Sequence, residues 1–356
     1  MTPSPHPPLS TMTTLRLGGP PRRLVSATTD AELVDALRGS SGEAVFLLGG
    51  GSNVVVSDDG YDGLVVQVVT KGIGFERVGG RVHVTVAAGE VWDDLVAVCV
   101  ERGLSGLSCL SGIPGSVGAT PLQNVGAYGS EVSDTIVSVK VCERATGAVD
   151  DVPGASCAFG YRTSRFRGTD THAVLAVTFA LTEEPEAHVP DYAEVRRALG
   201  VGPGDRVPLA TLRDTILGLR RAKGMVLDPD DPDSVSAGSF FTNPLLSDAD
   251  VVRLRARVRT VVGDEEPPLF PDRASGLTKS SAAWLIERAG FRRGYGDGRV
   301  GLSTKHTLAL VNRGGASTEE LVAFARHIRN GVAERFGVHL EPEPIFVGFQ
   351  GVTNPL

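Results

Sequence analysis

The sequence predicts an α+β fold, and three observations support this prediction. Runs of alternating apolar residues, typical of strands, are mixed with apolar residues at helical spacing from about residue 22 to residue 184. Glycine is abundant, with 44 residues, which implies many tight turns and close backbone approaches. The last third of the chain contains two helical patterns followed by a strand-like run. Such a mixture indicates helices layered on sheets.

The first elements alternate between helix and strand. TTDAELVDAL offers an N-cap residue and places Leu33, Val34 and Leu37 at helical spacing. AVFLLGGGSNVVVS then runs from a strand through a glycine turn into a second strand. The valines of FERVGGRVHVTVAAG repeat with a period of two around Gly79 and Gly80, which predicts a hairpin.

Further elements continue this pattern. EVWDDLVAVCVERG predicts a helix that ends at Gly103, and TIVSVKVCE and AVLAVTFAL predict strands. Near the C-terminus, SSAAWLIERAG predicts one helix, and STEELVAFARHIRNGVAERFG predicts a longer one that begins with a capping box of Ser317 and Glu320. The terminal EPIFVGF predicts a strand.

Pro, Gly and charged residues concentrate between about residues 182 and 208, which we interpret as a domain boundary. We therefore predict a disordered tail at 1–14, a first domain at 15–184 with subdomains at about 15–70 and 71–184, a linker and loop region at 185–222, and a second domain at 223–356. The proline-separated aspartates of DPDDPDSV (228–235) predict a solvated loop rather than a calcium loop, whose spacing differs.

Composition limits the function classes. A net charge of -7 and a pI near 5.6 give no reason to expect a nucleic-acid partner. The four cysteines lack metal-ligand spacing, so we expect reduced, mostly buried thiols and no metal site. Because we find neither an apolar run of membrane-spanning length nor a signal-peptide pattern, we expect a cytoplasmic protein with no membrane partner.

Three glycine-rich stretches indicate a site for a phosphate or a flat ring, because residues without Cβ let backbone N–H groups approach a ligand. They are LGGGSNVV (48–55), SGIPGSVGA (111–119) and QNVGAYGSE (123–131). Neither a P-loop nor a GxGxxG strand-to-helix turn is present, and the GVGPG run follows no strand. A dinucleotide, if one binds, is held in another way.

Four polar stretches are further candidates: FGYRTSRFRG (159–168), RRAKG (220–224), SAGSFFTNP (236–244) and LEPEP (340–344). Guanidinium groups bind carboxylates, a basic turn can meet a phosphate, and proline-fixed glutamates suit a positioned acid, although each stretch also fits a solvated surface. A Ser-His-Asp hydrolase is a rival interpretation of Ser239, but the GxSxG elbow is missing.

The long motifs LGGGSNVVVSDDGYDGLVV, SGIPGSVGATPLQNVGAYGSEV, FGYRTSRF, KGMVLDP, AGSFFTNP, AAWLIERAG and HLEPEP occur in this order. Together they resemble the UDP-N-acetylenolpyruvoylglucosamine reductases, flavoenzymes that complete UDP-N-acetylmuramate synthesis for peptidoglycan. The resemblance covers nearly the whole chain apart from the N-terminal tail. It implies an FAD-binding fold of the vanillyl-alcohol-oxidase type, with two α/β subdomains, followed by a C-terminal α+β domain that binds the UDP-sugar.

The resemblance also implies a monomeric enzyme with FAD and NADPH as cofactors and UDP-N-acetylglucosamine enolpyruvate as substrate. NADPH reduces the flavin, and the vinyl ether then accepts hydride at its methylene carbon. Arg162 would stabilise the enolate carboxylate, Glu343 would assist it, and Ser239 would protonate the adjoining carbon. The residues implied in FAD binding are Gly49, Gly50, Gly51, Ser52, Asn53, Gly112, Ile113, Pro114, Gly115, Ser116, Gly118, Gln123, Asn124, Gly126, Ala127 and Tyr128.

Substrate contacts are implied for Tyr161, Lys223 and Asn243, and for Tyr192, which matches the tyrosine of an extra loop in the long form of this family. The sequence departs from the family pattern at Pro344, which removes a backbone N–H beside Glu343, so Glu341 remains an alternative acid. Another flavoenzyme of the same fold, an oxidase, and a non-catalytic nucleotide-sugar binding protein remain alternative functions. The motifs AGSFFTNP and LEPEP favour the reductase over the oxidase.

Overall fold

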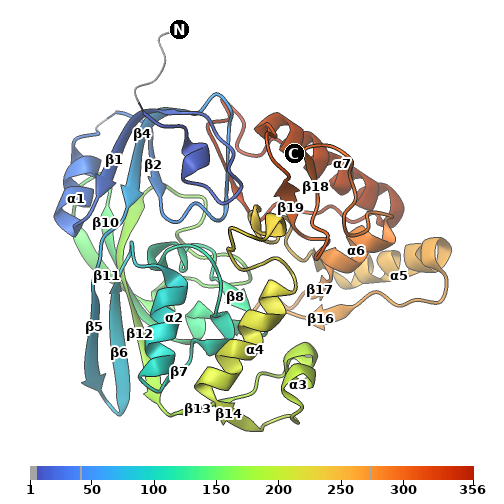
Figure 1. The fold of residues 1–356 in the computed structure, drawn as a ribbon, viewed down its shortest axis with the longest axis horizontal. Coiled ribbons are helices and arrows are strands. Elements are labelled where there is room, and N and C mark those ends of the chain that lie inside the picture. Colours follow the sequence, from blue (N-terminus) through green and yellow to red (C-terminus); the bar gives the residue numbers. More distant parts are fainter. Residues whose placement is uncertain (1–5, 41, 273) are drawn as a thin grey trace. The chain divides into compact units, whose positions relative to one another are not determined.

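A computed structural model describes residues 6–40, 42–272 and 274–356, and in it the chain forms two compact units (Figure 1). The N-terminal unit comprises residues 22–50 and 63–222, and the C-terminal unit comprises the described residues up to 21 together with 51–62 and 223–356. This division differs from the contiguous one expected from the sequence. The reason is a non-local pairing, because the strand at 54–56 lies beside one at 345–347.

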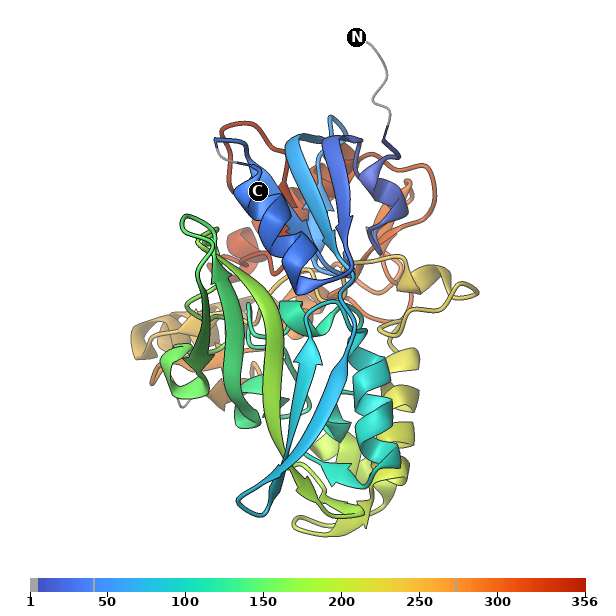
Figure 2. The ribbon, with the colours of Figure 1, turned by 90° about the vertical axis from the view of Figure 1, so that its left-hand side faces the viewer.

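The N-terminal unit contains two main sheets. Its elements up to residue 183 are β1 (Pro21–Ala27), α1 (Asp30–Arg38), β2 (Val45–Leu48), β4 (Tyr61–Val68), β5 (Ile73–Val78), β6 (Arg81–Ala87), α2 (Trp92–Glu101), β7 (Leu104–Ser105), β8 (Gly126–Ala127), β9 (Ser130–Glu131), β10 (Ile136–Glu143), β11 (Val149–Pro153) and β12 (His172–Glu183), with short 3-10 turns η2 (Ser108–Leu110), η3 (Val117–Ala119), η4 (Val132–Asp134) and η5 (Gly154–Ser156). The larger sheet is antiparallel in the order β11-β10-β12-β6-β5, and the smaller has the order β1-β4-β2 with α1 beside it (Figure 2).

The predicted local elements of this unit are confirmed. Thr29 caps α1 by accepting a hydrogen bond from the Glu32 N–H, and the β5–β6 hairpin turns through two glycines with positive φ. Trp92 of α2 is fully buried and meets Phe179 of β12 edge to face, with 5.8 Å between ring centroids. This contact packs α2 against the larger sheet.

The segment 185–222 was expected to be a linker and loop region, and this prediction is wrong. It forms the hairpin of β13 (Glu186–His188) and β14 (Arg206–Pro208) and the helices α3 (Ala193–Leu199) and α4 (Leu209–Arg221). Val195, Leu212 and Ile216 are fully buried in a cluster that also contains Cys109 and Tyr128, so the segment packs against earlier parts of the same unit. Helices α2 and α4 lie side by side (Figures 1 and 2). The abundance of Pro and Gly reflects turns between these elements.

The described residues of the C-terminal unit form short strands and α-helices. Its elements are η1 (Leu9–Thr11), β3 (Val54–Val56), η6 (Pro232–Ser234), β15 (Leu245–Leu246), α5 (Asp248–Val262), β16 (Leu269–Pro271), β17 (Thr278–Ser280), α6 (Ala282–Arg288), β18 (Val300–Leu302), β19 (Leu310–Asn312), α7 (Thr318–Phe336) and β20 (Ile345–Val347). The predicted capping box at Ser317 and Glu320 is confirmed. Asp58 adds a long-range cap, since its carboxylate accepts the Thr318 N–H at 2.7 and 3.0 Å.

The described part of the predicted tail is ordered, which corrects the expectation of disorder over 1–14. Residues 1–5 lie outside the described residues. Leu9 is fully buried, and its N–H donates to the Gly19 carbonyl at 3.0 Å. Thr14 donates from its hydroxyl to the Ser236 carbonyl at 2.6 Å. The segment is therefore held by contacts with distant residues, which its own apolar pattern does not reveal.

The four cysteines are buried free thiols, as predicted, and burial raises the pKa of the Cys99 thiol to about 12. Over the described ranges, no helix combines the length and the apolar character needed to cross a membrane.

Candidate functional site

Two of the glycine stretches meet in the N-terminal unit. A Cβ on Gly49 would lie 2.2 Å from Ser116 Oγ, and one on Gly50 would lie 2.7 Å from the Gly115 Cα. A Cβ on Gly118 would lie 2.5 Å from the Ala88 Cβ. Because real Cβ atoms essentially never approach this closely, these three contacts require glycine at positions 49, 50 and 118.

The second of these loops, residues 111–118, is anchored at its C-terminal end. The N–H groups of Val117 and Gly118 donate to the carbonyls of Glu90 and Ala88, each at 2.9 Å. Gly112 and Gly115 have φ values of +72° and +118°, which turn successive backbone amides in ways that other residues rarely adopt. A glycine-rich loop held in this way fits the close approach of a pyrophosphate or a flavin ring. We name residues 49–50 and 111–118 the glycine cradle.

Of the predicted FAD-binding residues, Gly51, Ser52 and Asn53 lie in the C-terminal unit, while all the others lie in the N-terminal unit. The chain thus passes from one unit to the other inside the first glycine stretch. Gly51 has a φ of +61°, and a Cβ there would lie 2.0 Å from the Met12 carbonyl oxygen.

Arg162 is held by the third glycine stretch. Its guanidinium donates to the carbonyls of Asn124 at 3.2 Å and Gly126 at 2.6 Å, and it lies 5.4 Å from the Tyr161 ring centroid. Asn124, which is buried, donates in turn from its side chain to the Gly160 carbonyl at 3.2 Å. Arg162 and Asn124 have φ values of +52° and +46°, which is unusual for residues other than glycine. The structure therefore joins FGYRTSRF to the QNVGAYG stretch, as a shared site requires.

Tyr128 and Tyr192 also come together in this unit. Their rings pack edge to face with 5.3 Å between centroids. Burial raises the pKa of the Tyr128 hydroxyl to about 12, so this group stays protonated. Tyr192 is 42% exposed and immediately precedes α3, which leaves its ring accessible.

An ion pair that the sequence analysis missed supports the cradle. Arg213 of α4 donates to both carboxylate oxygens of Asp93 of α2, at 2.6 and 2.9 Å, and the Gly112 N–H donates to Asp93 Oδ1 at 2.6 Å. Burial raises the pKa of Asp93, but the hydrogen bonds from Arg213 and Gly112 outweigh it and hold the pKa below its usual value. No single-sequence pattern connects residues 120 positions apart.

The C-terminal unit positions Ser239. Gly238 has a φ of +69°, as expected for a backbone turn at this residue, and the partly exposed Ser239 follows it. Phe240 and Phe241 are buried and pack edge to face with 5.2 Å between centroids. The Phe240 N–H donates to the Leu308 carbonyl at 2.8 Å. The two rings thus anchor the turn that presents the hydroxyl.

LEPEP lies directly beside this turn. The Glu343 N–H donates to the Phe240 carbonyl at 2.9 Å, and the Thr242 N–H donates to the Glu341 carbonyl at 3.0 Å. Asn53 donates from its side chain to the Glu343 carbonyl at 3.4 Å. Ser239, Glu343 and Asn53 are therefore brought together, although Pro344 has no N–H. Glu341 is the more exposed of the two acids.

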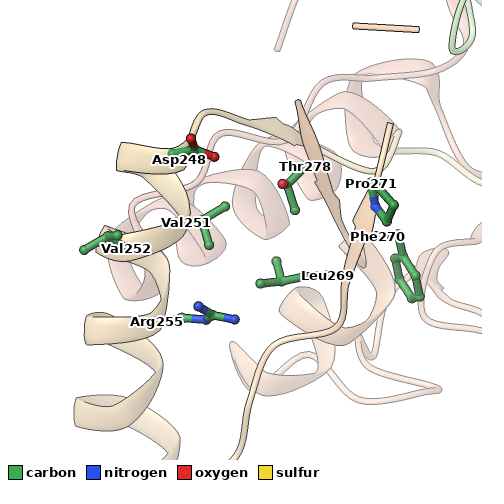
Figure 3. A pocket seen from close by; sticks show the side chains of 8 residues that line it. All are labelled: Asp248, Val251, Val252, Arg255, Leu269, Phe270, Pro271 and Thr278. Carbon is green, nitrogen blue, oxygen red and sulfur yellow. The ribbon is translucent and has the colours of Figure 1, made fainter. Parts of the chain in front are cut away.

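Lys223 and Asn243 lie in the same unit. Lys223 is partly exposed and follows the C-terminus of α4. The Asn243 side chain accepts the Ala282 N–H at 3.0 Å, so it caps α6. A groove of about 420 Å³ opens elsewhere in this unit, between α5 and the strands β16 and β17 (Figure 3). Its lining includes Val252, Arg255 and Phe270, and none of the predicted site residues borders it.

Comparisons with known proteins agree with this geometry. Residues 21–152 match the family described as "FAD binding domain", and residues 230–347 match "UDP-N-acetylenolpyruvoylglucosamine reductase, C-terminal domain". Together with the glycine cradle, these matches define the chain as an FAD-dependent oxidoreductase. Its fold is of the FAD-binding type expected from the sequence.

Relatives that match along nearly their full length identify the family within this class of oxidoreductases. The UDP-N-acetylenolpyruvoylglucosamine reductase of Streptomyces avermitilis is 53% identical over 96% of this chain and 94% of its own length, and that of Thermobifida fusca is 53% identical over 96% and 97%. The crystal structure of the enzyme from Thermus caldophilus superposes with a TM-score of 0.64 at 24% identity, over 96% of this chain and 97% of that one. The chain belongs to the UDP-N-acetylenolpyruvoylglucosamine reductase family.

The ion pair of Asp93 and Arg213 yields a first prediction. Asp93→Asn removes the charge that Arg213 binds and weakens the support of the Gly112 loop. We expect FAD to bind about tenfold more weakly, a loss of about 1.4 kcal/mol, because the pair is only partly buried. Fluorescence titration of the apoprotein with FAD measures this change.

Asp94→Asn is the matched control, because Asp94 is the exposed neighbour on the same helix. The lowered pKa of Asp93 determines how FAD affinity depends on pH. The ion pair is fully formed at pH values above the usual pKa of an aspartate, and it is lost only as the pH falls through the lowered pKa of Asp93. The difference between wild type and Asp93→Asn should therefore stay constant from about pH 5 to about pH 8. Equal FAD affinities of the two variants would exclude this role.

Proposed function

We propose that this protein reduces UDP-N-acetylglucosamine enolpyruvate to UDP-N-acetylmuramate with electrons from NADPH, in the synthesis of peptidoglycan precursors. Membership of the family along nearly the full length supports the proposal. The structural observation that carries it is the pairing of the Ser239 turn with LEPEP, which brings a hydroxyl and a carboxyl group to neighbouring backbone positions. An FAD-binding fold alone does not require this pairing.

The cofactor fits the chain. The glycine cradle would hold FAD, because its glycines permit close backbone packing and leave backbone N–H groups free of a neighbouring Cβ at those positions. Bound FAD supplies hydride transfer from NADPH to the vinyl methylene carbon of the substrate. In balance, NADPH loses a hydride, the carbon–carbon double bond gains that hydride and one proton, and NADP⁺ leaves.

Arg162 would stabilise the negative charge that develops on the substrate carboxylate. The carbonyls of Asn124 and Gly126 hold its guanidinium in place before the substrate arrives. A charge oriented in advance requires no reorganisation during the reaction, which is the main source of electrostatic stabilisation in enzymes. Tyr161, at the face of the same guanidinium, would line this part of the substrate site.

Ser239 would deliver the proton to the carbon next to the methylene group. A serine hydroxyl is a weak acid, but an enolate carbanion is a strong base, so a positioned hydroxyl suffices. Glu343, rather than Glu341, would assist in protonated form, because it is the less exposed of the two acids and its backbone is joined to Phe240, the residue next to Ser239. Lys223 would face the diphosphate, and Tyr192 and Asn243 would contact the rest of the substrate.

We also propose that the enzyme is a cytoplasmic monomer, as expected from the sequence. Four reduced, buried thiols support an intracellular setting. Light scattering of the purified protein measures its mass, and fractionation of cells measures its location. A dimer in solution, or recovery outside the cytoplasmic fraction, would contradict the respective part.

One experiment tests the reaction. The purified yellow protein is reduced anaerobically with NADPH, and UDP-N-acetylglucosamine enolpyruvate is then added while the flavin absorbance is followed. We expect the substrate to reoxidise the flavin with formation of UDP-N-acetylmuramate. A flavin that the substrate leaves reduced under these conditions, and that is reoxidised only when oxygen is then admitted, would identify an oxidase of the same fold, and a colourless protein would identify a binding protein. Either result would overturn the proposal.

A further inference from the structure

The acidic run at 228–234 is not the fully solvated loop that the sequence predicts. Asp233 and Ser234 are buried at the short helix η6, while Asp230 remains exposed. Ser234 donates from its hydroxyl to the carbonyls of Asp228 at 2.7 Å and Asp231 at 2.8 Å. The run therefore folds back on itself and turns one carboxylate inward, where a buried charge needs hydrogen-bond donors.

Those donors come from the turn that follows β18. Asp233 accepts the Thr304 N–H at 2.8 Å and the Thr304 hydroxyl at 2.6 Å. Lys305 forms an ion pair with the neighbouring Asp231 at 2.9 Å. Partial burial raises the pKa of Asp233, but the hydrogen bonds from Thr304 outweigh it and bring the pKa below its usual value, so the carboxylate is charged.

The contact continues along the chain toward Ser239. The Val235 carbonyl accepts the Asn312 N–H at 3.0 Å, Ser236 forms a backbone bridge with Val311, and the Phe240 N–H donates to Leu308. The stretch from 235 to 240 thus runs antiparallel to residues 308–312, and the Asp233 side chain reaches Thr304, which precedes them. Hydrogen bonds hold both ends of the segment 233–240: Asp233 accepts two from Thr304, and the Phe240 N–H donates one to the Leu308 carbonyl. The turn that carries Ser239 therefore lies between two residues that are fixed by hydrogen bonds.

Asp233 also contacts the turn that carries Lys223. A Cβ on Gly224 would lie 2.9 Å from the Asp233 Cβ, and Gly224 has a φ of +65°, so only glycine fits this position. A Cβ on Gly238 would lie 3.9 Å from Met225 Sδ, which shows that the two turns adjoin. One buried carboxylate therefore lies where both predicted substrate-contacting segments of the C-terminal unit meet.

We propose that Asp233, locked by Thr304, is a positioning residue that sets Ser239 and Lys223 in the arrangement needed for protonation of the reduced substrate. It does so through the backbone and touches neither substrate nor flavin. The inference rests on the proposed function, because the two residues it positions have their roles only in that reaction. It also explains why the acidic run exists.

Thr304→Val tests the lock with the smallest change. It removes the hydroxyl at 2.6 Å and leaves the backbone N–H bond and the Asp233 charge in place. We expect reoxidation of the NADPH-reduced flavin by substrate to slow about tenfold, and about 100-fold in Asp233→Ala, because small displacements of reacting groups have effects of this size. Flavin reduction by NADPH and FAD affinity should stay within about twofold of wild type.

Thr304→Ser and Asp230→Ala are the matched controls. Serine restores the hydroxyl, so Thr304→Ser should recover the wild-type rate of reoxidation. Asp230→Ala removes an exposed carboxylate of the same run and should behave like wild type. Thermal unfolding of every variant is measured alongside. Rescue by serine together with an unequal effect on the two half-reactions supports a positioning role.

Failure of the proposed function and failure of the positioning role give different results. If substrate does not reoxidise the wild-type flavin, the proposed function itself is wrong. If it does, but Thr304→Val and Asp233→Ala react as fast as Asp230→Ala, the positioning role is overturned. The role is equally overturned if both half-reactions fall together in proportion to the unfolded fraction, because Asp233 then contributes only to stability.

Discussion

Ser239→Ala should leave flavin reduction by NADPH nearly intact and slow reoxidation by the enolpyruvyl substrate about 10²- to 10⁴-fold, the range that general acids contribute. The alanine side chain lacks the proton that Ser239 would deliver, whereas Gly238 and the buried phenylalanines still form the turn. Anaerobic stopped-flow absorbance separates the two half-reactions. The effect is expected to be large because no backbone group replaces a missing proton donor.

Two companion variants make this result specific. Ser239→Cys retains a proton donor and should keep part of the activity. Thr242→Val removes another hydroxyl of the same segment, one that donates a long hydrogen bond to the Glu341 carbonyl at 3.4 Å, and should react like wild type. Equal losses in both half-reactions of Ser239→Ala would remove Ser239 from the protonation step.

Arg162→Lys should slow reoxidation by substrate about 10²- to 10³-fold, as expected when one preorganised donor to a developing negative charge is lost. Lysine cannot reproduce the planar guanidinium that donates to Asn124 and Gly126 at once and still faces a carboxylate. Single-turnover reoxidation and substrate titration measure the effect. Reduction by NADPH should change little.

Arg165→Lys is the control, because Arg165 is an exposed arginine of the same FGYRTSRF motif. FAD content is measured for both variants, since Arg162 also holds the Asn124 and Gly126 carbonyls of a predicted FAD-binding stretch. Wild-type reoxidation in Arg162→Lys would exclude the proposed role. Loss of bound FAD, with normal reoxidation of the remaining holoenzyme, would reassign Arg162 to support of that stretch.

Much of the fold could be predicted because its signals are local. The Thr29 cap, the Gly79–Gly80 turn and the capping box at Ser317 each depend on residues within a few positions of one another. Such contacts form wherever the local sequence allows them. The helices of 185–222 were missed because their turns dominate the composition of the segment, while Val195 and Leu212 are buried by partners far away in the sequence.

The candidate site was predictable as a set of motifs, and the structure adds the contacts within each unit. Ser239 and Glu343 become neighbours through the bond between Glu343 and Phe240. Asp93 and Arg213 form an ion pair although they are 120 positions apart in the sequence, and Asp233 accepts a hydrogen bond from Thr304, which is 71 positions away. In a run of charged residues that is typical of a solvated loop, the sequence does not show which of them is buried.

The sequence by itself determined the local elements, the reduced thiols, and the ordered motifs that indicate the family, because each depends on residue type and short spacing. Tertiary structure alone decided that the segment at 51–62 belongs with the C-terminal residues, that Leu9 is buried, and that Asp233 is locked by Thr304. The physical reason is that burial and long-range hydrogen bonding are properties of the assembled chain. A residue has these properties only when a distant partner covers it.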